Sequence, residues 1–228
     1  MKITGLLFSL LLLNAGLFAQ NITEEDQAAL TKIFSQFITT GYTVADTAMA
    51  DFNNDGLTDV VIVADNKNDP DQNRSLVILA KTVSGFVIAA KSNAAVLCSM
   101  CGGVFGDPYA GISFNKNVIT IYHYGGSAWR WTSNFTFRFQ NNQWELIGIS
   151  QDSYFNAEDC NGKGVGASGR NLKEVNFSTK KLHIIETSGT SCKPKRDLWF
   201  RFQSYQKITL DTFDVDKDYL KDITLLKL

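Results

Sequence analysis

The chain has 228 residues, of which 44% are hydrophobic and only 3 are proline. This composition excludes a disordered or collagen-like chain and is sufficient for one buried core. The formal net charge is -1 and becomes -2 without the first 19 residues, which carry one lysine and no acids. A charge so close to zero argues against nucleic acid or an anionic membrane surface as a partner.

Residues 1–19 have the pattern of a secretory signal peptide. A lysine follows the first methionine, residues 6–13 are apolar, and Ala19 ends a plausible cleavage site. The apolar stretch is too short to span a bilayer, no cysteine follows it to carry a lipid anchor, and no later segment has the character of a membrane span. We therefore expect a mature chain of residues 20–228 that forms a single domain in the periplasm or outside the cell.

The first element of the mature chain is an amphipathic helix. Thr23 and the three acids after it are typical of a helix start. The apolar residues that follow have the spacing of one helix face: Leu30, Ile33, Phe34, Phe37 and Ile38.

Residues 51–59 have the signature of a calcium-binding loop. Oxygen-bearing side chains occupy positions 1, 3, 5 and 9 of the loop, and these are Asp51, Asn53, Asp55 and Asp59. Gly56 permits a sharp turn, and the carbonyl of Leu57 is placed to add a backbone oxygen. Because Ca²⁺ prefers six to eight oxygen ligands, we predict a structural Ca²⁺ that neutralises the carboxylates and fixes the loop.

The surroundings of this loop distinguish it from an EF-hand. An EF-hand requires a glutamate at position 12 and flanking helices, whereas position 12 is Ile62 and residues 60–64 read as a buried strand. Residues 46–65 resemble the core of an FG-GAP or VCBS repeat. The resemblance implies a Ca²⁺-binding loop between two strands of a β-propeller blade, although no second full copy follows. The alternative is an Asx-rich turn that binds no metal.

Four cysteines lie in the mature chain: Cys98, Cys101, Cys160 and Cys192. In an oxidising compartment we favour two structural disulfides, Cys98–Cys101 and Cys160–Cys192, although sequence alone does not choose among the three pairings. A zinc site would show two close pairs, and a redox-active pair would open a helix, which the glycines after Cys101 oppose.

The chain after the helix reads as short antiparallel strands. Hairpins are predicted for residues 76–80 with 86–90, 112–114 with 118–124, and 175–177 with 182–185. The longest strand signal covers residues 129–140, in which odd-numbered aromatic residues alternate with polar ones, and Asn141-Asn142 forms a turn after it. We predict a mainly β fold, an antiparallel meander arranged as a sandwich or as propeller-like sheets, with the helix at one edge.

Residues 123–131 are the candidate ligand site. His123, Tyr124 and Arg130 accompany two tryptophans and a diglycine, a composition that suits a sugar or an anionic group. The alternative is that the aromatic residues belong to the core. The sequence has no Gly-x-Ser-x-Gly nucleophile elbow and no His-Glu-x-x-His zinc motif.

These features predict a calcium-stabilised binding module for a protein or glycan ligand. An extracellular polymer hydrolase and an envelope-associated inhibitor remain as alternatives. A hydrolase would require a cleft with paired carboxylates or a histidine, and His123 is the residue around which we would expect it.

Overall fold

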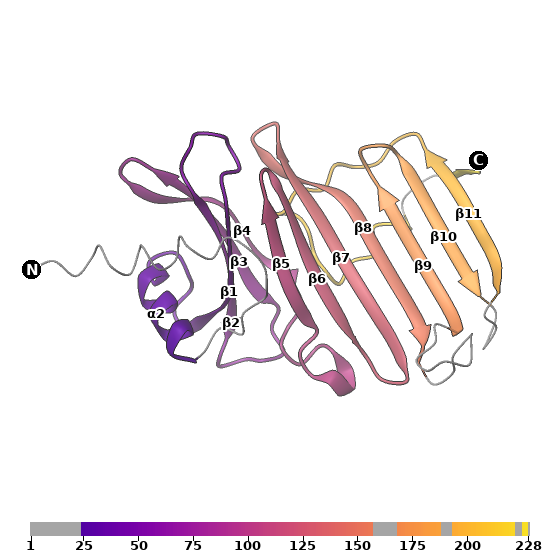
Figure 1. The fold of residues 1–228 in the computed structure, drawn as a ribbon, viewed down its shortest axis with the longest axis horizontal. Helices are drawn as coiled ribbons and strands as arrows, with labels where there is room; N and C mark the ends of the chain where they lie inside the picture. Colours follow the sequence, from indigo (N-terminus) through magenta and orange to yellow (C-terminus); the bar gives the residue numbers. More distant parts are fainter. Residues whose placement is uncertain (1–23, 157–167, 188–192, 222–224, 228) are drawn as a thin grey trace, which may run out of the picture.

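The computed structural model describes residues 24–156, 168–187, 193–221 and 225–227. Within them lie two antiparallel β-sheets and one α-helix near the N-terminus (Figure 1), which confirms the predicted fold class. The predicted signal peptide, Cys160 and Cys192 lie outside the described residues. The described residues contain no helix with the length and hydropathy that a transmembrane span requires.

The smaller sheet is a four-stranded meander packed against the helix. Its elements are α2 (Glu24–Phe34), β1 (Tyr42–Ala50), β2 (Asp59–Asn66), β3 (Arg74–Thr82) and β4 (Gly85–Val96). Phe34 packs with Ile62 and Val77 on one face, while Val61 and Ile78 belong to the core shared with the larger sheet. Both faces of β2 and β3 are therefore covered, which explains their continuous apolar sequences.

The larger sheet has eight strands in the order β12-β11-β10-β9-β8-β7-β6-β5. The strands are β5 (Tyr109–Asn115), β6 (Val118–Gly126), β7 (Trp129–Gln140), β8 (Gln143–Phe155), β9 (Ser168–Asn176), β10 (Lys181–Thr187), β11 (Pro194–Phe202) and β12 (Leu225–Lys227). A short 3-10 helix, η1 (Gly103–Phe105), precedes them. The three predicted hairpins are confirmed as β3–β4, β5–β6 and β9–β10.

The turn between β7 and β8 follows directly from its sequence. Asn141 and Asn142 have φ angles of 52° and 58°, and Gln140 pairs with Gln143. Two consecutive positive φ angles are typical of a type I′ turn, and asparagine tolerates this conformation better than most residues.

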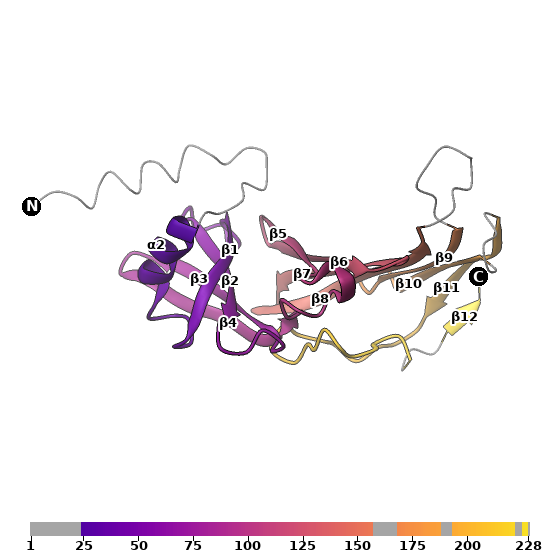
Figure 2. The ribbon, with the colours of Figure 1, turned by 90° about the horizontal axis from the view of Figure 1, so that it is seen from below.

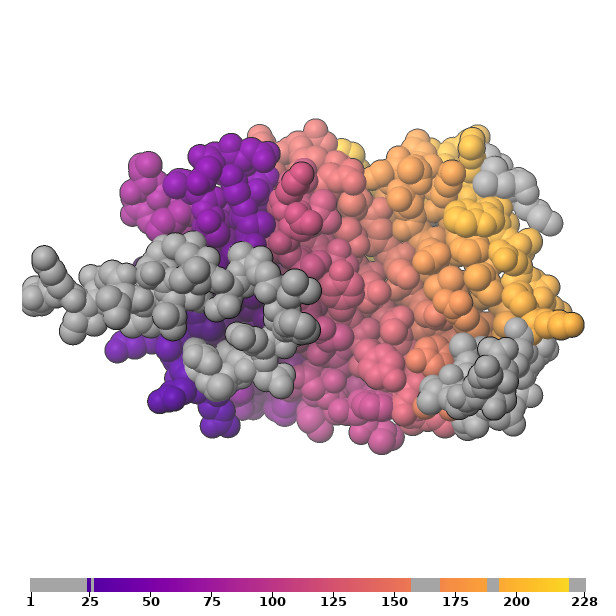
Figure 3. All heavy atoms as spheres, in the orientation of Figure 1, coloured from indigo at the N-terminus to yellow at the C-terminus, as the bar shows by residue number. Residues whose placement is uncertain are grey.

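The two faces of the larger sheet differ in their cover. On the inner face, the segment 203–221 lies across the sheet (Figure 2), and Phe213 packs 4.8 Å from Phe135 and 5.1 Å from Phe137 between ring centroids. On the outer face, η1 contacts β6, and apart from η1 no described element lies over strands β6 to β11 (Figure 3). The predicted alternation along β7 is confirmed, but the core ends before Trp129, which is 50% exposed.

Phe52 joins the two sheets. It lies in the loop between β1 and β2, is 4% exposed, and contacts Phe139 at 4.7 Å and Trp144 at 5.3 Å between ring centroids. The predicted calcium loop is therefore held against the larger sheet by one buried aromatic side chain.

Candidate functional site

The loop over residues 51–59 connects β1 to β2, as a strand-to-strand loop should. The backbone N–H of Asp55 donates to the side-chain oxygens of Asp51 (3.2 Å) and Asn53 (3.1 Å), and Gly56 N–H donates to the other Asp51 oxygen (2.9 Å). Gly56 has a φ of 82°, which explains the glycine at this position. These hydrogen bonds hold the side-chain oxygens of two residues, Asp51 and Asn53, over one turn.

The contacts of Asp55 define how the loop would accept a cation. One Asp55 oxygen accepts from Leu57 N–H at 2.8 Å, and the other accepts from the Asn53 amide at 2.8 Å. Within the described ranges, no three His, Cys, Asp or Glu side chains form a group that could hold a metal ion. The donor set for a cation would therefore be mixed, combining carboxylates with the Asn53 oxygen and backbone carbonyls.

Asp59 anchors the loop to the smaller sheet. Its side chain is fully buried and accepts hydrogen bonds from Phe52 N–H (2.9 Å) and Lys81 N–H (2.8 Å). Burial raises the pKa of Asp59, the two amides oppose this, and the nearby charges of Asp55 and Asp51 raise it further, so that the net direction is upward. A cation beside these carboxylates would relieve that repulsion.

His123 lies away from any ligand surface. It is 1% exposed on the inner face of β6, where Nε2 accepts from Leu97 N–H (3.2 Å) and Nδ1 lies 3.1 Å from the Ser133 carbonyl. Since a carbonyl only accepts, Nδ1 carries the proton. Burial lowers the pKa of His123 to about 4. The structure does not bring His123 together with Arg130, because alternation places them on opposite faces.

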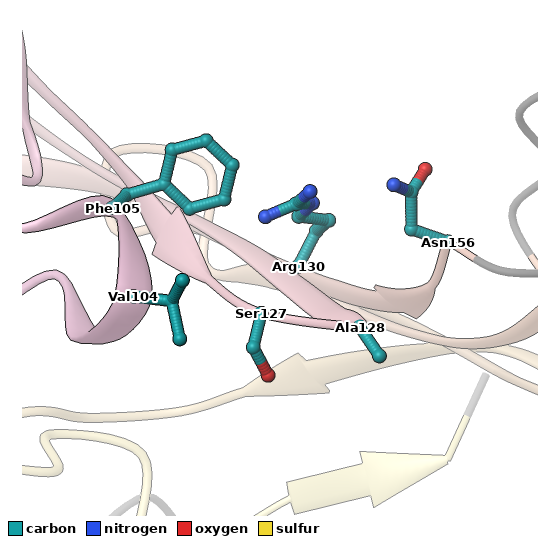
Figure 4. Close-up of a pocket in the computed structure, with 6 residues that line it drawn as sticks. All are labelled: Val104, Phe105, Ser127, Ala128, Arg130 and Asn156. Carbon is teal, nitrogen blue, oxygen red and sulfur yellow. The ribbon is translucent and has the colours of Figure 1, made fainter.

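Arg130 and Tyr124 do share one region, on the outer face where β6 turns into β7. Arg130 lines an open cavity of about 330 Å³ (Figure 4), and the lining residues are Val104, Phe105, Ser127, Ala128, Arg130 and Asn156. The guanidinium carbon lies 4.0 Å from the centroid of the Phe105 ring. The Tyr124 and Phe105 rings pack edge to face, with 5.5 Å between their centroids. We call this the Arg130 pocket.

The positive charge of the Arg130 pocket is not neutralised by the described part of the chain. No described carboxylate forms an ion pair with Arg130, in contrast to Arg74, Arg170 and Arg196. The buried Nε of Arg130 also has no hydrogen-bond acceptor among the described residues. An arginine held over an aromatic ring with open donors is suited to an anionic group.

Sequence reasoning identified Arg130 and Tyr124 but missed the rest of the pocket. Val104 and Phe105 come from η1, in a glycine-rich turn after the cysteine pair, and they are 83% and 47% exposed. The signal for this part of the pocket in the sequence was Phe105, an aromatic residue among the glycines of a turn. Its meeting with Arg130 depends on the tertiary fold.

An ionic cluster around the buried Arg74, between the sheets, was also missed. Arg74 is 1% exposed, donates to both oxygens of Asp107 (2.9 and 2.6 Å) and to the Leu97 carbonyl (3.0 Å), and pairs with Asp65. The burial of an arginine lowers the stability of the fold by several kcal/mol unless the charge is paired. Here each of the three guanidinium nitrogens contacts an oxygen acceptor.

The cluster continues through Tyr109 to Asp46. The Tyr109 hydroxyl donates to Asp46 at 2.8 Å and so joins β5 to β1, and Arg74 lies 5.2 Å from the Tyr109 ring centroid. Burial raises the pKa of Asp46, with its hydrogen bond to Tyr109 opposing, and burial also raises the pKa of Tyr109. The cluster clamps the two sheets together.

The disulfide predicted between Cys98 and Cys101 is confirmed, with 5.2 Å between the Cα atoms. It closes the turn that leads into η1 and thereby helps to position Phe105 at the Arg130 pocket. The predicted Cys160–Cys192 pairing falls on residues outside the described ranges.

Comparison with protein-family models, with curated proteins and with solved structures finds no match for this chain. The residues of the two candidate sites therefore provide the evidence for function.

Proposed function

We propose that the protein is a secreted or periplasmic binding module that captures an acidic group of a protein or glycan ligand in the Arg130 pocket. The observation that carries this proposal is the guanidinium of Arg130, which faces an open cavity with no described carboxylate to neutralise it. The signal-peptide pattern and the Cys98–Cys101 disulfide support a location outside the cytoplasm.

The walls of the pocket suit a carboxylate attached to an apolar or ring-shaped group. Phe105 holds the guanidinium from one side, while Ser127 and Asn156 offer neutral hydrogen-bonding groups around it. A bidentate arginine–carboxylate contact is about twice as strong as a neutral hydrogen bond. Nothing in this arrangement requires a chemical step, so binding is the function that it supports.

Calorimetric titration with oligogalacturonate and hexaglutamate, each against an uncharged counterpart, tests the Arg130 pocket. We expect binding of a carboxylate probe and a loss of about 10- to 100-fold in Arg130→Ala, because a hydrogen bond to a charged group is worth roughly 1.5–3 kcal/mol. Arg138→Ala is the matched control, since Arg138 lies on the same face of β7 outside the pocket. Equal affinity in both variants, or no binding of either acidic probe, contradicts the proposal.

We also infer that Ca²⁺ binds the loop over residues 51–59. Asp51, Asn53 and Asp55 fit such an ion because their oxygens gather over one turn, and buried Asp59 experiences the charges of two neighbouring carboxylates. The bound ion would supply only positive charge and oxygen coordination. Phe52 would transmit the resulting stability to the junction of the sheets, because it belongs to the same loop.

Melting curves of the mature protein in chelator and in millimolar Ca²⁺ test the loop. A concentration 100-fold above Kd stabilises the native state by about 2.7 kcal/mol, which for this size is roughly 5–10 °C. We expect Asp55→Ala to abolish the increase in Tm and Asp71→Ala, an exposed acid in another loop, to retain it. Identical melting curves with and without Ca²⁺, on protein first made metal-free, would reject this inference.

A further inference from the structure

A second cavity lies on the inner face of the larger sheet, opposite the Arg130 pocket. It measures about 290 Å³, and its lining residues are Trp131, Thr132, Ser133, Gln151, Asp152, Ser153, Asn171 and Lys173. Trp131 belongs to the predicted ligand segment 123–131, whereas His123, Tyr124, Arg130 and the predicted metal ligands do not line this cavity. We call it the Trp131 cavity.

Trp131 is held rigidly at one side of this cavity. A Cβ atom added to Gly125 would lie 2.6 Å from Cζ2 of the Trp131 ring and 3.0 Å from the Gly102 carbonyl. The ring therefore packs directly on the backbone of β6, which only glycine permits. Trp131 remains half-buried rather than enclosed, so part of the ring is available to a ligand.

The strand register places a polar floor beside the ring. Ser133, Gln151 and Lys173 are paired in one row across β7, β8 and β9, and Trp131, Ser153 and Asn171 are paired in the next. All six alternate onto the inner face. With a rise of about 3.4 Å per residue and about 4.8 Å between strands, the floor measures roughly 7 by 10 Å.

These polar side chains have hydrogen-bonding capacity that the described protein does not use. Gln151 donates to Ser133 only at 3.5 Å. The side chains of Ser153, Asn171 and Lys173 make no hydrogen bond or ion pair with any residue in the described ranges. Asp152, which also lines the cavity, pairs with Arg170 at 2.7 Å.

We propose that the Trp131 cavity binds a neutral glycan. A sugar ring presents an apolar C–H face, which suits a fixed indole, and a rim of hydroxyl groups, which both donate and accept hydrogen bonds. Gln151, Asn171 and Ser153 offer both kinds of partner, and Lys173 donates without requiring a charged ligand. The open width across three strands accommodates part of a longer chain.

Calorimetric titration of the full mature chain with cellohexaose, mannohexaose and chitohexaose tests the proposal. We expect one of these sugars to bind, and Asn171→Ala and Gln151→Ala each to weaken it by about tenfold, as the loss of a ligand hydrogen bond does. Neither substitution truncates an apolar core residue, so both variants should fold. Absence of binding by all three sugars at millimolar concentration, or unchanged affinity in both variants, overturns the proposal.

Tryptophan fluorescence locates the bound sugar. The sugar-induced change should disappear in Trp131→Phe and persist in Trp199→Phe, because Trp199 lies on the outer face, stacked on His183 with 4.1 Å between ring centroids. Persistence in the first variant or loss in the second also overturns the proposal. Arg130→Ala should bind the sugar normally, so failure of the acidic-group site and failure of this cavity are distinguishable.

Discussion

The two sheets differ in how their faces are covered. The smaller sheet is covered on both faces, by α2 on one side and by the larger sheet on the other, and six consecutive residues of β2 from Asp59 to Ala64 are buried. The larger sheet is covered on its inner face only in part, and its strands alternate between buried and open positions. The larger sheet therefore has the exposed surface that the proposed binding requires, whereas the smaller sheet is mostly buried.

This contrast separates the roles of the candidate sites. The candidate calcium loop belongs to the smaller sheet and contacts the larger sheet through Phe52. The Arg130 pocket and the Trp131 cavity lie at the same end of β7, on opposite faces of the larger sheet. Substitutions in the smaller sheet should therefore act on stability, whereas substitutions around β7 should act on binding.

The largest effect is expected from matched isoleucine truncations. Ile62 is fully buried in the smaller sheet, and Ile185 is half-buried on the outer face of the larger sheet. Ile62→Ala should lower the free energy of unfolding by about 2–5 kcal/mol, and Ile185→Ala by about 1 kcal/mol. Urea denaturation measures the free energy of unfolding of both variants. Equal losses of stability would contradict the distinction between a sheet covered on both faces and a sheet covered on one.

The junction between the sheets should depend on pH through His123. Its folded pKa of about 4 lies below the unfolded value, so the unfolded state binds more protons between pH 6.5 and 4. Stability should fall by up to roughly 3 kcal/mol as the pH falls through that window. Comparison of the unfolding free energies of the wild type and His123→Gln at pH 7 and 4.5 isolates this contribution. A difference between the two proteins that does not change with pH would show that His123 does not titrate in this way.

The smallest effect is expected at His183 on the outer face. Burial lowers the pKa of His183, but hydrogen bonds to Asp197 (2.9 Å) and Glu174 (3.2 Å) outweigh it, so that the net direction is upward. The folded state then holds its proton more tightly, and this stability is present below pH 6.5 and lost as the pH rises through the raised pKa. His183→Gln should cost under about 1 kcal/mol at pH 6, as partly exposed ion pairs do, and less at pH 8. A larger loss of stability at pH 8 than at pH 6 would contradict this prediction.

Local patterns in the sequence predicted most of the fold. Alternation, continuous apolar runs and asparagine or glycine at turns identified the hairpins, because each depends on residues that are neighbours along the chain. The Cys98–Cys101 disulfide is equally local, with a sequence separation of 3. The same alternation does not show how far the cover of the sheet extends: it places Trp129 on the same face as the buried phenylalanines, although half of Trp129 is exposed.

Local sequence patterns alone are therefore sufficient to predict three hairpins, the strand over residues 129–140 with its Asn141-Asn142 turn, and the loop of oxygen-bearing side chains at residues 51–59. Which side chains contact one another across the sheets and around the cavities depends on the tertiary structure. Arg74 donates a hydrogen bond to Asp107, which is 33 residues away in the sequence. Arg130 contacts Phe105, although two strands lie between them in the sequence. Such contacts depend on strand register and on how the segment 203–221 crosses the sheet, and neither is encoded within a single local pattern.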